Sequence, residues 1–333
     1  MNRPATIDDV ARAAGVSRQT VSNVINTPAI VREQTRERVA EAITRLGYAP
    51  SASARRLRTR RSSTIGIHLD PYAGGISGVV LDRFVHALTE RAGERGLRVV
   101  LYAARSPEEE IRRMADLRDG GEIDGVVITG TFHGDPRTGW LSERGVPFVS
   151  FGRPWGLDDV ADPAHLWVDV DGASGTGDAT RHALATAGPR VAFLGWPSGS
   201  GTGDDRERGW REALPAGAPV RRLTSEENVA RARDVVADAL VADDIDALVC
   251  ASDSLAVGAH LAAVAAGRPQ LPIIGFDNTP VAEALGLSSV EQLPEKVASG
   301  ALDLLIGATG AIALRAPSPG EAHVLVAPRL IVR

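Results

Sequence analysis

The chain is poor in the residues that build disulfides, cysteine-based zinc sites and membrane spans. It has one cysteine, Cys250, among 333 residues, so no disulfide framework or cysteine-based zinc site can form within one chain. No apolar run reaches the roughly 18 residues of a membrane helix, and the amino terminus lacks the basic-then-apolar layout of a secretory signal. We therefore expect a cytoplasmic protein in which Cys250 is a small buried hydrophobe.

Common catalytic and phosphate-binding motifs are also missing. Lys296, the only lysine, follows no phosphate-binding loop, and neither G-x-S-x-G nor H-E-x-x-H occurs. Residues 169–172 begin like a calcium loop but lack the rest of the ligand pattern. The glycine-rich residues 199–203 have neither the spacing of the dinucleotide-binding fingerprint nor that of a Walker A loop. They therefore let the backbone approach a ligand or simply form a loop. We expect no metal, no cofactor and no enzymatic activity.

Charge is distributed unevenly along the chain. The whole sequence carries a net charge of −5, yet residues 1–61 hold twelve arginines against five acidic residues, which is +7. The other residues therefore carry −12. A basic head on an acidic body is typical of a nucleic-acid-binding module joined to something else. With 44% hydrophobic residues, the length predicts two or three domains.

Residues 6–15 have the spacing of a short helix that ends at a glycine. Apolar side chains recur at helical spacing from Ile7 to Ala14. Thr6 stands at the N-cap position, and Asp9 follows three residues later, which is a capping box with a shortened acid. Gly15 is free to adopt the positive φ of a sharp turn. A second short helix after this turn would complete a helix-turn-helix.

The second predicted helix carries side chains that suit the edges of DNA bases. Ser17 caps it, and Val21, Val24 and Ile25 face inward. Arginine can donate twice to guanine, and glutamine or asparagine can pair twice with adenine in the major groove. The predicted DNA contacts of the head are Thr6, Ser17, Arg18, Gln19, Thr20, Ser22 and Asn23. An ordinary helical hairpin with a solvated polar face is the alternative.

A third helix and an arginine-rich linker follow. Pro28 breaks the second helix, and residues 32–46 have core spacing up to Gly47, which completes a helix-turn-helix domain over residues 1–48. Residues 49–61 hold five arginines in about two helical turns, too short a helix to be stable alone in water. We expect this linker to become ordered on DNA. A flexible charged tether is the alternative.

From residue 64 onward, buried strands alternate with amphipathic helices. Strands are predicted at 65–69, 97–102, 125–129 and 147–151, with helices at 77–95 and 106–119. A second set has strands at 166–170, 191–194, 247–250 and 271–276, with helices at 173–187, 204–213, 227–241 and 254–266. Strands separated by helices imply parallel sheets. The pattern predicts two α/β lobes with a ligand cleft at the carboxyl ends of their strands.

Polar and aromatic residues gather near these strand ends. Sugars offer paired hydroxyls to carboxylates and guanidinium groups, and an apolar ring face to tryptophan. The candidate ligand residues are Asp70, Arg153, Trp155, Trp167, Trp196, Arg206, Asp253 and Asp277. Each of them has a structural alternative, such as an aspartate that caps a helix. Trp140 and Trp210 are assigned instead to the core or the surface.

Several motifs resemble one known family. T-I-D-D-V-A-R-A-A-G-V-S-R-Q-T-V-S-N-V-I-N at residues 6–26 closely resembles the amino terminus of lac repressor family (LacI/GalR) transcription regulators. F-L-G-W-x(8)-D-R-E-R-G-W and G-F-D-N-T resemble later segments of the family. A-S-D-S-L-A-V-G-A matches its N-D-x-x-A-x-G-A pattern, with Ser252 in place of asparagine. The resemblance therefore extends over essentially the whole chain.

This resemblance implies an architecture for the chain. The family has a two-lobed, periplasmic-binding-protein-like body in which the chain crosses between the lobes three times. The first lobe would comprise residues 62–161 and 292–316, including a helix over 294–314. The second lobe would comprise residues 162–289 and 317–333. The linker would form a hinge helix in the minor groove, in which Leu57 wedges between base pairs and Arg55 and Arg58 lie beside phosphates.

The resemblance also implies ligand contacts and a function. Arg206 would hold sugar hydroxyls, Asp277 would line the site and Trp167 would stack on the effector. Gln292 is included as a contact, although residues 286–294 lack the family's P-P-L-T-T entry to the third crossover. We predict a repressor that binds a near-palindromic operator as a homodimer and responds to a mono- or oligosaccharide. A sugar-transport binding protein and a sugar-processing enzyme are the alternatives.

Overall fold

The computed structural model describes two compact units, Met1–Ser62 and Ser63–Arg333. The described residues are 3, 5–48, 61–69, 78–155, 160, 162–242, 244–307, 310–314 and 320–333. The predicted contacts Arg55, Leu57, Arg58 and Asp70 lie outside these ranges. Within them, no helix combines the length and apolar character that a membrane crossing requires.

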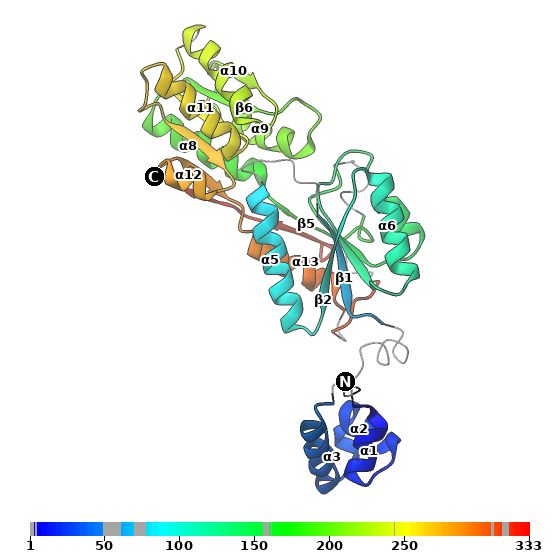
Figure 1. Cartoon of the computed structure of the whole chain (residues 1–333). Coiled ribbons are helices and arrows are strands. Elements are labelled where there is room, and N and C mark those ends of the chain that lie inside the picture. The colour runs from blue at the N-terminus through cyan, green and yellow to red at the C-terminus, as the bar shows by residue number, and fades with distance from the viewer. Residues whose placement is uncertain are drawn as a thin grey trace. The chain divides into compact units, whose positions relative to one another are not determined.

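The first unit is a small helical head (Figure 1). Its elements are α1 Ile7–Ala14, α2 Arg18–Asn26, the 3-10 helix η1 Pro28–Ile30 and α3 Glu33–Leu46. Val10, Val21 and Val39 are fully buried at its centre. Gly15 and Gly47 end α1 and α3 with positive φ angles of 65° and 60°. The expected three-helix head is therefore confirmed.

Local side-chain hydrogen bonds start the first two helices of the head. Thr6 and Asp9 form the predicted capping box, and the hydrogen bond from the Thr6 hydroxyl lowers the pKa of Asp9 to about 2. The Ser17 hydroxyl accepts a hydrogen bond from the backbone N–H of Thr20 at 3.1 Å. These caps satisfy backbone donors that have no partner within the helix. They hold α1 and α2 on either side of the turn at Gly15.

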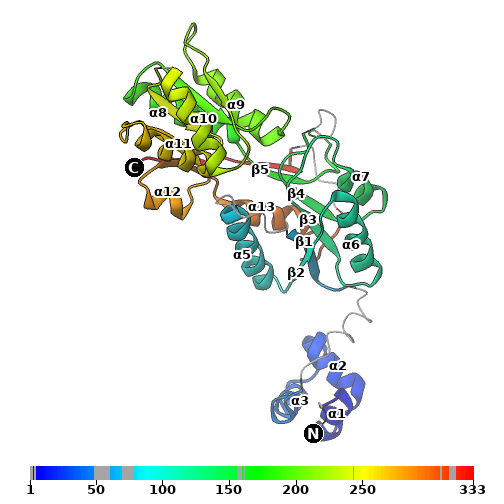
Figure 2. The ribbon, with the colours of Figure 1, turned by 45° about the horizontal axis from the view of Figure 1, so that its top comes forward.

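The second unit contains two six-stranded sheets, one in each lobe (Figure 1, Figure 2). In the first lobe the strand order is β2-β1-β3-β4-β5-β11, and all neighbours are parallel. The strands are β1 Thr64–Leu69, β2 Arg98–Ala103, β3 Gly125–Ile128, β4 Phe148–Phe151, β5 Trp167–Val170 and β11 His323–Val326. The central strands β3 and β5 are wholly buried, as expected for a parallel sheet covered on both faces.

Helices cover both faces of the first sheet. They are α5 Gly78–Glu94, α6 Pro107–Asp119, α7 Pro136–Glu143 and α13 Pro294–Leu305. Helices α5 and α13 pack against each other, and α13 lies on β4 and β5 (Figure 1). Helices α6 and α7 pack together on the other face around Met114 and Leu141 (Figure 2).

The second lobe repeats this architecture with the strand order β7-β6-β8-β9-β10-β12. Its strands are β6 Val191–Gly195, β7 Arg222–Thr224, β8 Ala247–Cys250, β9 Ile273–Phe276, β10 Ser288–Glu291 and β12 Arg329–Ile331. Its helices are α8 Gly172–Thr186, α9 Gly201–Ala213, α10 Val229–Ala242, α11 Asp253–Ala265 and α12 Pro280–Ala284. Only the edge pair β10–β12 is antiparallel among the described strands. The expected two-lobed body with parallel sheets is confirmed.

The structure corrects three boundaries drawn from the sequence. Strand β5, expected in the second lobe, pairs with β4 in the first sheet, so the chain first crosses after Val170 rather than near residue 162. Strand β11 also belongs to the first sheet and β12 to the second, so the described residues 320–333 are shared between the lobes. The helix expected over 294–314 ends at Leu305, because Ile306 turns extended and pairs with Ile312.

Candidate functional site

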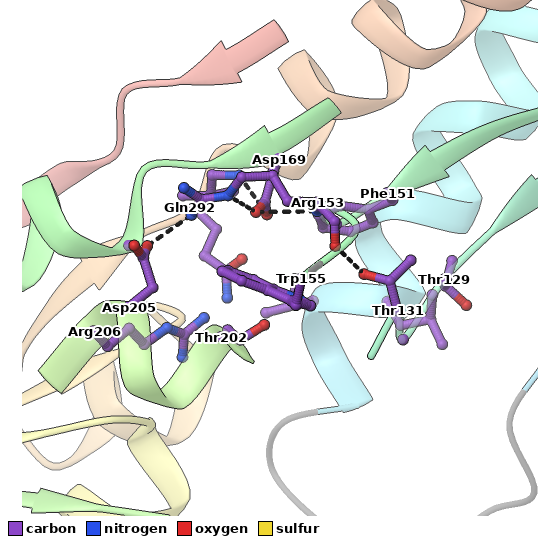
Figure 3. A pocket seen from close by; sticks show the side chains of 16 residues that line it. Thr129, Thr131, Phe151, Arg153, Trp155, Asp169, Thr202, Asp205, Arg206 and Gln292 are labelled. Atoms are coloured by element: carbon purple, nitrogen blue, oxygen red, sulfur yellow. Dashed lines mark hydrogen bonds and ion pairs between the residues drawn. The ribbon is translucent and has the colours of Figure 1, made fainter. Parts of the chain in front are cut away.

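A cavity of about 230 Å³ lies between the two lobes (Figure 3). It is smaller than the roughly 300 to 1,000 Å³ of pockets for drug-sized ligands, so a small ligand fits it. The first lobe contributes Val80, Leu81, Thr129, Gly130, Thr131, Phe151, Gly152, Arg153, Trp155, Asp169 and Val170. The second lobe contributes Gly172, Thr202, Asp205 and Arg206, and Gln292 comes from the crossover into α13. Most of these residues follow or end the carboxyl ends of strands, where parallel sheets bind ligands.

Arg153 connects the two walls of the cavity. Its Nε donates to Asp169 Oδ2 at 2.7 Å, and its Nη2 donates to Asp205 Oδ2 at 2.7 Å (Figure 3). Arg153 follows β4 and Asp169 lies on β5, both in the first lobe, whereas Asp205 belongs to α9 in the second. The side chains of Asp169 and Asp205 are 11% and 6% exposed, so this charged network is largely shielded from water. It joins the lobes beside the ligand space.

Trp155 is held between the same two walls. The guanidinium of Arg153 lies 4.7 Å from the centre of its indole ring, within the range of a cation–π interaction. The indole also lies so close to Gly201 that a Cβ at this position would overlap two of the indole carbons. Any larger residue at the first position of α9 would therefore require the indole or the start of the helix to move. The glycine-rich stretch around residues 199–203 is the start of this helix, capped by Ser200.

Arg206 is the most enclosed cation at the cavity. Its guanidinium lies 3.7 Å from the ring centre of Phe276 and 5.4 Å from that of Trp196. Its Nη1 donates to the carbonyl oxygen of Ala251 and lies 3.8 Å from Oδ1 of Asp277. Burial lowers the pKa of Arg206, and the nearby carboxylates oppose that shift. The side chain is thus fixed from several sides.

The turn after β9 places Asp277 behind Arg206. Asp277 and Asn278 have positive φ angles of 114° and 49°, which non-glycine residues rarely adopt. Asp253 stabilises this turn, because its carboxylate accepts hydrogen bonds from the backbone N–H and hydroxyl of Thr279 and from the hydroxyl of Ser289. Asp253 is fully buried and positions the turn; it is not among the described residues that line the cavity.

Three polar atoms at the cavity are buried without a hydrogen-bond partner. They are Thr129 Oγ1, Trp155 Nε1 and Arg206 Nε. Among the described residues, only one further buried side-chain polar atom, Thr176 Oγ1, is in the same condition. An unpaired buried polar group costs about 1 to 3 kcal/mol, so such atoms gather where a ligand supplies the missing partner. The cavity is therefore the strongest candidate ligand site.

The structure brings together some of the sequence-predicted ligand residues and separates others. Arg153, Trp155, Arg206 and Gln292 line the cavity. Asp277 lies just behind the wall, where its Oδ1 accepts a hydrogen bond from Gln292 Nε2 at 2.5 Å. Trp196 is a neighbour of Arg206, and its Nε1 donates to Glu227. Gln292 therefore lines the cavity even though residues 286–294 lack the family's P-P-L-T-T motif at the third crossover.

Trp167 does not belong with the predicted ligand contacts. It opens β5 at the amino end, three residues before Val170, whereas the cavity lies at the carboxyl end of that strand. Its ring stacks on His323 at 4.7 Å, and its Nε1 donates to the carbonyl oxygen of Val160. Trp210, assigned to the core or surface from the sequence, is fully buried.

Several residues of the cavity are not predicted by the sequence pattern. They are Asp169, Asp205, Thr129, Thr131 and Thr202. Asp169 stands in the sequence as part of an incomplete calcium loop, and Asp205 precedes Arg206 in the D-R-E-R-G-W segment. An aspartate at the end of an apolar strand is the one signal that points to Asp169. Among the described residues, no group of three His, Cys, Asp or Glu is arranged to hold a metal ion.

In the head, α2 presents its polar side chains outward. Arg18 and Gln19 are exposed, and Ser22 and Asn23 are partly exposed. The Gln19 amide donates to Asn23 Oδ1 at 3.0 Å, so these two side chains share one face of the helix. Three other predicted contacts take part in helix capping. The Thr6 hydroxyl donates to Asp9, and Ser17 and Thr20 hydrogen-bond to each other. Arg18 and Gln19 are exposed and take no part in this capping.

The chain combines a helix-turn-helix head with a two-lobed α/β body that has a polar cavity between its lobes. This combination defines a regulator that binds both DNA and a ligand. Residues 6–51 match the model for bacterial regulatory proteins of the lacI family. Residues 80–301 match the model for periplasmic binding proteins and the sugar binding domain of the LacI family. The chain belongs to the LacI family of DNA-binding transcription regulators.

Individual relatives agree with this assignment. The HTH-type transcriptional regulator CelR of Thermobifida fusca is 34% identical over 302 residues, which cover 84% of each chain. A solved CelR–cellobiose complex is 29% identical, with a TM-score of 0.69 over 99% of each chain. The lac repressor dimer bound to operator and the anti-inducer ONPF has a TM-score of 0.79 over 99% of this chain and 98% of that one. At 22% identity, the last comparison shows a shared fold.

Proposed function

We propose that this protein is a repressor that binds a near-palindromic operator as a homodimer and responds to a small sugar in the cavity between its lobes. It would act in the cytoplasm, where the operator DNA lies, and it would catalyse no reaction on the sugar. The observation that carries the effector role is the set of three unpaired buried atoms at the cavity: Thr129 Oγ1, Trp155 Nε1 and Arg206 Nε. Sugar hydroxyl and ring oxygens would supply their missing partners.

The DNA-binding part of the proposal rests on α2 and on charge. Arg18 and Gln19 are exposed at the start of α2, where the recognition helix of a helix-turn-helix meets base edges. The excess of positive charge over residues 1–61 would attract the phosphate backbone. A single head reads one half-site, so two copies of the chain would meet the two halves of a near-palindrome.

Ligand binding would be coupled to DNA binding through the angle between the lobes. The cavity is lined from both lobes, and the ion pair between Arg153 and Asp205 spans them. A sugar that contacts Trp155 on one wall and Arg206 on the other would favour one lobe angle over others, because a ligand shifts an equilibrium only by its differential affinity. The changed angle would alter the spacing of the two linkers over residues 49–61, and so their order on DNA.

The test combines sugar binding and DNA binding by the full chain. Thermal melting in a panel of neutral hexoses, pentoses and disaccharides, including cellobiose, should give a rise in melting temperature with at least one sugar, since binding to the native state stabilises it. Selection from a randomised DNA library should return an inverted repeat whose affinity changes when that sugar is added.

Controls separate the two alternative functions. Incubating the protein with the binding sugar and analysing the solution for products tests an enzymatic role, and conversion of the sugar would contradict the proposal. A sugar-binding transport protein would bind the sugar but select no DNA sequence. Selection of a non-repeated site, or a selected site whose affinity no sugar changes, would contradict the homodimeric, sugar-responsive regulator.

A further inference from the structure

We propose that Arg83 is a positioning residue that ties the two lobes together at the third crossover and thereby sets the angle between them. The inference rests on the proposed function for its consequence on DNA binding, because the lobe angle is the route from the cavity to the operator. The observation that carries it is a single guanidinium that binds one carboxylate on each side of the crossover.

Arg83 lies on α5 of the first lobe. Its Nη1 donates to Glu291 Oε1 at 3.0 Å, and Glu291 is the last residue of β10 in the second lobe. Its Nε and Nη2 donate to Glu295 Oε1 at 3.1 and 2.9 Å, and Glu295 lies in the first turn of α13 in the first lobe. The third crossover, residues 292–294, stands between these two acids. The guanidinium therefore clamps the chain where it passes from one lobe to the other.

The Glu291 carboxylate also holds the backbone on both sides of this point. Its side chain is 7% exposed, and it accepts hydrogen bonds from the backbone N–H of Leu293 at 3.2 Å and from the amide of Asn278 at 2.6 Å. Leu293 and Asn278 have positive φ angles of 56° and 49°, which non-glycine residues rarely adopt. Removing the cation from a largely buried carboxylate is strongly unfavourable, so the pair with Arg83 supports both of these turns.

The clamp is connected to the ligand cavity through the chain on either side of it. Gln292, the residue after Glu291, lines the cavity. Val80 and Leu81, which precede Arg83 on α5 by two to three residues, line it from the first lobe. A movement of α5 relative to the end of β10 would therefore displace cavity residues of both walls.

Two interlobe ion pairs at different places restrict the lobe angle more than one would. Arg153 and Asp205 join the lobes within the cavity wall, whereas Arg83 and Glu291 join them at the third crossover. A single tie leaves the lobes free to rotate about it, and a second tie opposes that rotation. Packed interfaces have a few discrete arrangements, so removing one tie should shift the population toward another lobe angle.

The structure supplies a matched control for the Arg83–Glu291 pair. Arg95, directly after α5, donates to Asp303 on α13. The side chains of Arg83 and Arg95 have similar exposure, 32% and 36%. Helices α5 and α13 pack side by side on the first sheet (Figure 1), so the Arg95–Asp303 pair stays within the first lobe. Breaking it tests what loss of an arginine beside α13 does when no interlobe contact is lost.

The first measurement uses the full chain without sugar or DNA. Ser142→Cys on α7 and Asp238→Cys on α10 place one spin label in each lobe, at exposed positions. Cys250 is buried and does not compete for the label. Labelled protein is diluted with excess unlabelled protein, and the distance distribution between the two labels of one chain is measured by pulsed electron resonance.

Arg83→Gln and Glu291→Gln should each add a second distance population or displace the wild-type one. The double variant should change the distribution no more than either single variant, because all three lack the same pair. Glu295→Gln and Arg95→Gln should keep the wild-type distribution, since both break contacts within the first lobe. If Glu291→Gln fails to fold, Arg83→Gln decides the test, because Arg83 is about one-third exposed. A wild-type distribution in folded Arg83→Gln, or the same change in Glu295→Gln, overturns the inference.

The second measurement is the affinity for the selected inverted repeat in the absence of any sugar. Arg83→Gln should change this affinity roughly threefold or more, upward or downward according to which lobe angle the operator prefers. Arg95→Gln should stay within about twofold of the wild type, although it removes the same charge. Altered label distances with unchanged operator affinity overturn the regulatory role of the tie. Altered distances in a protein that selects no DNA sequence leave the tie standing and contradict the proposed function instead.

Discussion

Nη1 of Arg206 lies 3.8 Å from Oδ1 of Asp277, and both side chains are buried at the second-lobe wall of the cavity. The ring of Phe276 covers the guanidinium, and Gln292 donates to the same oxygen of Asp277. A guanidinium cation and a buried carboxyl group are thus held together in this wall. The protonation of Asp277 affects how stability depends on pH, and the position of Arg206 affects how a ligand binds.

Asp277 should make the stability of the protein depend on pH. Burial raises the pKa of Asp277 to about 8, against the attraction of Arg206. In the unfolded chain the same carboxyl group ionises near pH 4. Between about pH 4 and 8 the unfolded state therefore binds fewer protons, so this group lowers the free energy of unfolding as pH rises. Asp277→Asn should remove this group's contribution to the fall in the free energy of unfolding with rising pH.

The measurement is urea unfolding at steps from about pH 4.5 to about pH 8.5. Asp178→Asn, on the exposed side of α8, is the control and should keep the wild-type pH profile. If the profile of Asp277→Asn runs parallel to that of the wild type, Asp277 does not titrate in this window.

Arg206→Lys should impair effector binding while the fold survives. Lysine keeps the positive charge beside Asp277 but lacks the planar fork that can donate to two adjacent hydroxyls. We expect the effector concentration at half-maximal response to rise roughly tenfold or more, about 1.4 kcal/mol, with little change in operator affinity. Arg208→Lys, two residues along α9 and half-exposed, should leave the response unchanged. An unchanged midpoint for Arg206→Lys would remove this residue from the site.

Gly201→Ala should weaken effector binding by displacing Trp155. The added Cβ would overlap the indole, so the indole or the start of α9 must move. Gly139→Ala is the matched control, because a Cβ at this position of α7 meets nothing within 4 Å. That change should leave sugar affinity unaltered and stabilise the fold by about 0.5 to 1 kcal/mol. Calorimetry and thermal melting measure both effects; equal sugar affinity in the two variants would contradict a role for Trp155.

Arg18→Ala should lower operator affinity by roughly 1 to 3 kcal/mol and relax the preference at one base position. Arg18 is exposed at the first position of α2, where it can reach a base edge. Arg45→Ala, exposed in the last turn of α3, is a matched charge control and should not change base preference. Binding to the selected site and to random DNA is compared for each variant. An equal loss on both by Arg18→Ala would show that Arg18 contacts only phosphate.

The head is predictable from sequence because its signals are local. Thr6 and Asp9 are three residues apart, and Gly15 and Ser17 mark the turn between the two helices. Each of these contacts depends on neighbours within one helical turn, so their order along the chain is enough to place them. The alternation of apolar strands with helices likewise identifies two parallel α/β lobes, because the residue period of each element is a local property.

Membership of a particular sheet is decided only by tertiary structure. The buried sequence W-V-D-V at residues 167–170 would suit a central strand of either sheet. It joins the first sheet because it hydrogen-bonds to β4, whereas periodicity carries no information about which neighbour a strand chooses. Trp167 is a different case: the predicted strand over 166–170 already puts it at the amino end, and there it stacks on His323, away from the cavity.

Tertiary structure also decides which charged residues pair with one another. The sequence predicts Arg153 as a site residue, but its partners Asp169 and Asp205 lie 16 and 52 residues further along the chain. Asp253 is a predicted ligand contact, yet folding places Thr279 and Ser289 against it and makes it a positioning residue. Local spacing determines which residues reach a strand end. The packing of two sheets determines which of them are already paired with one another and which retain a free donor for a ligand.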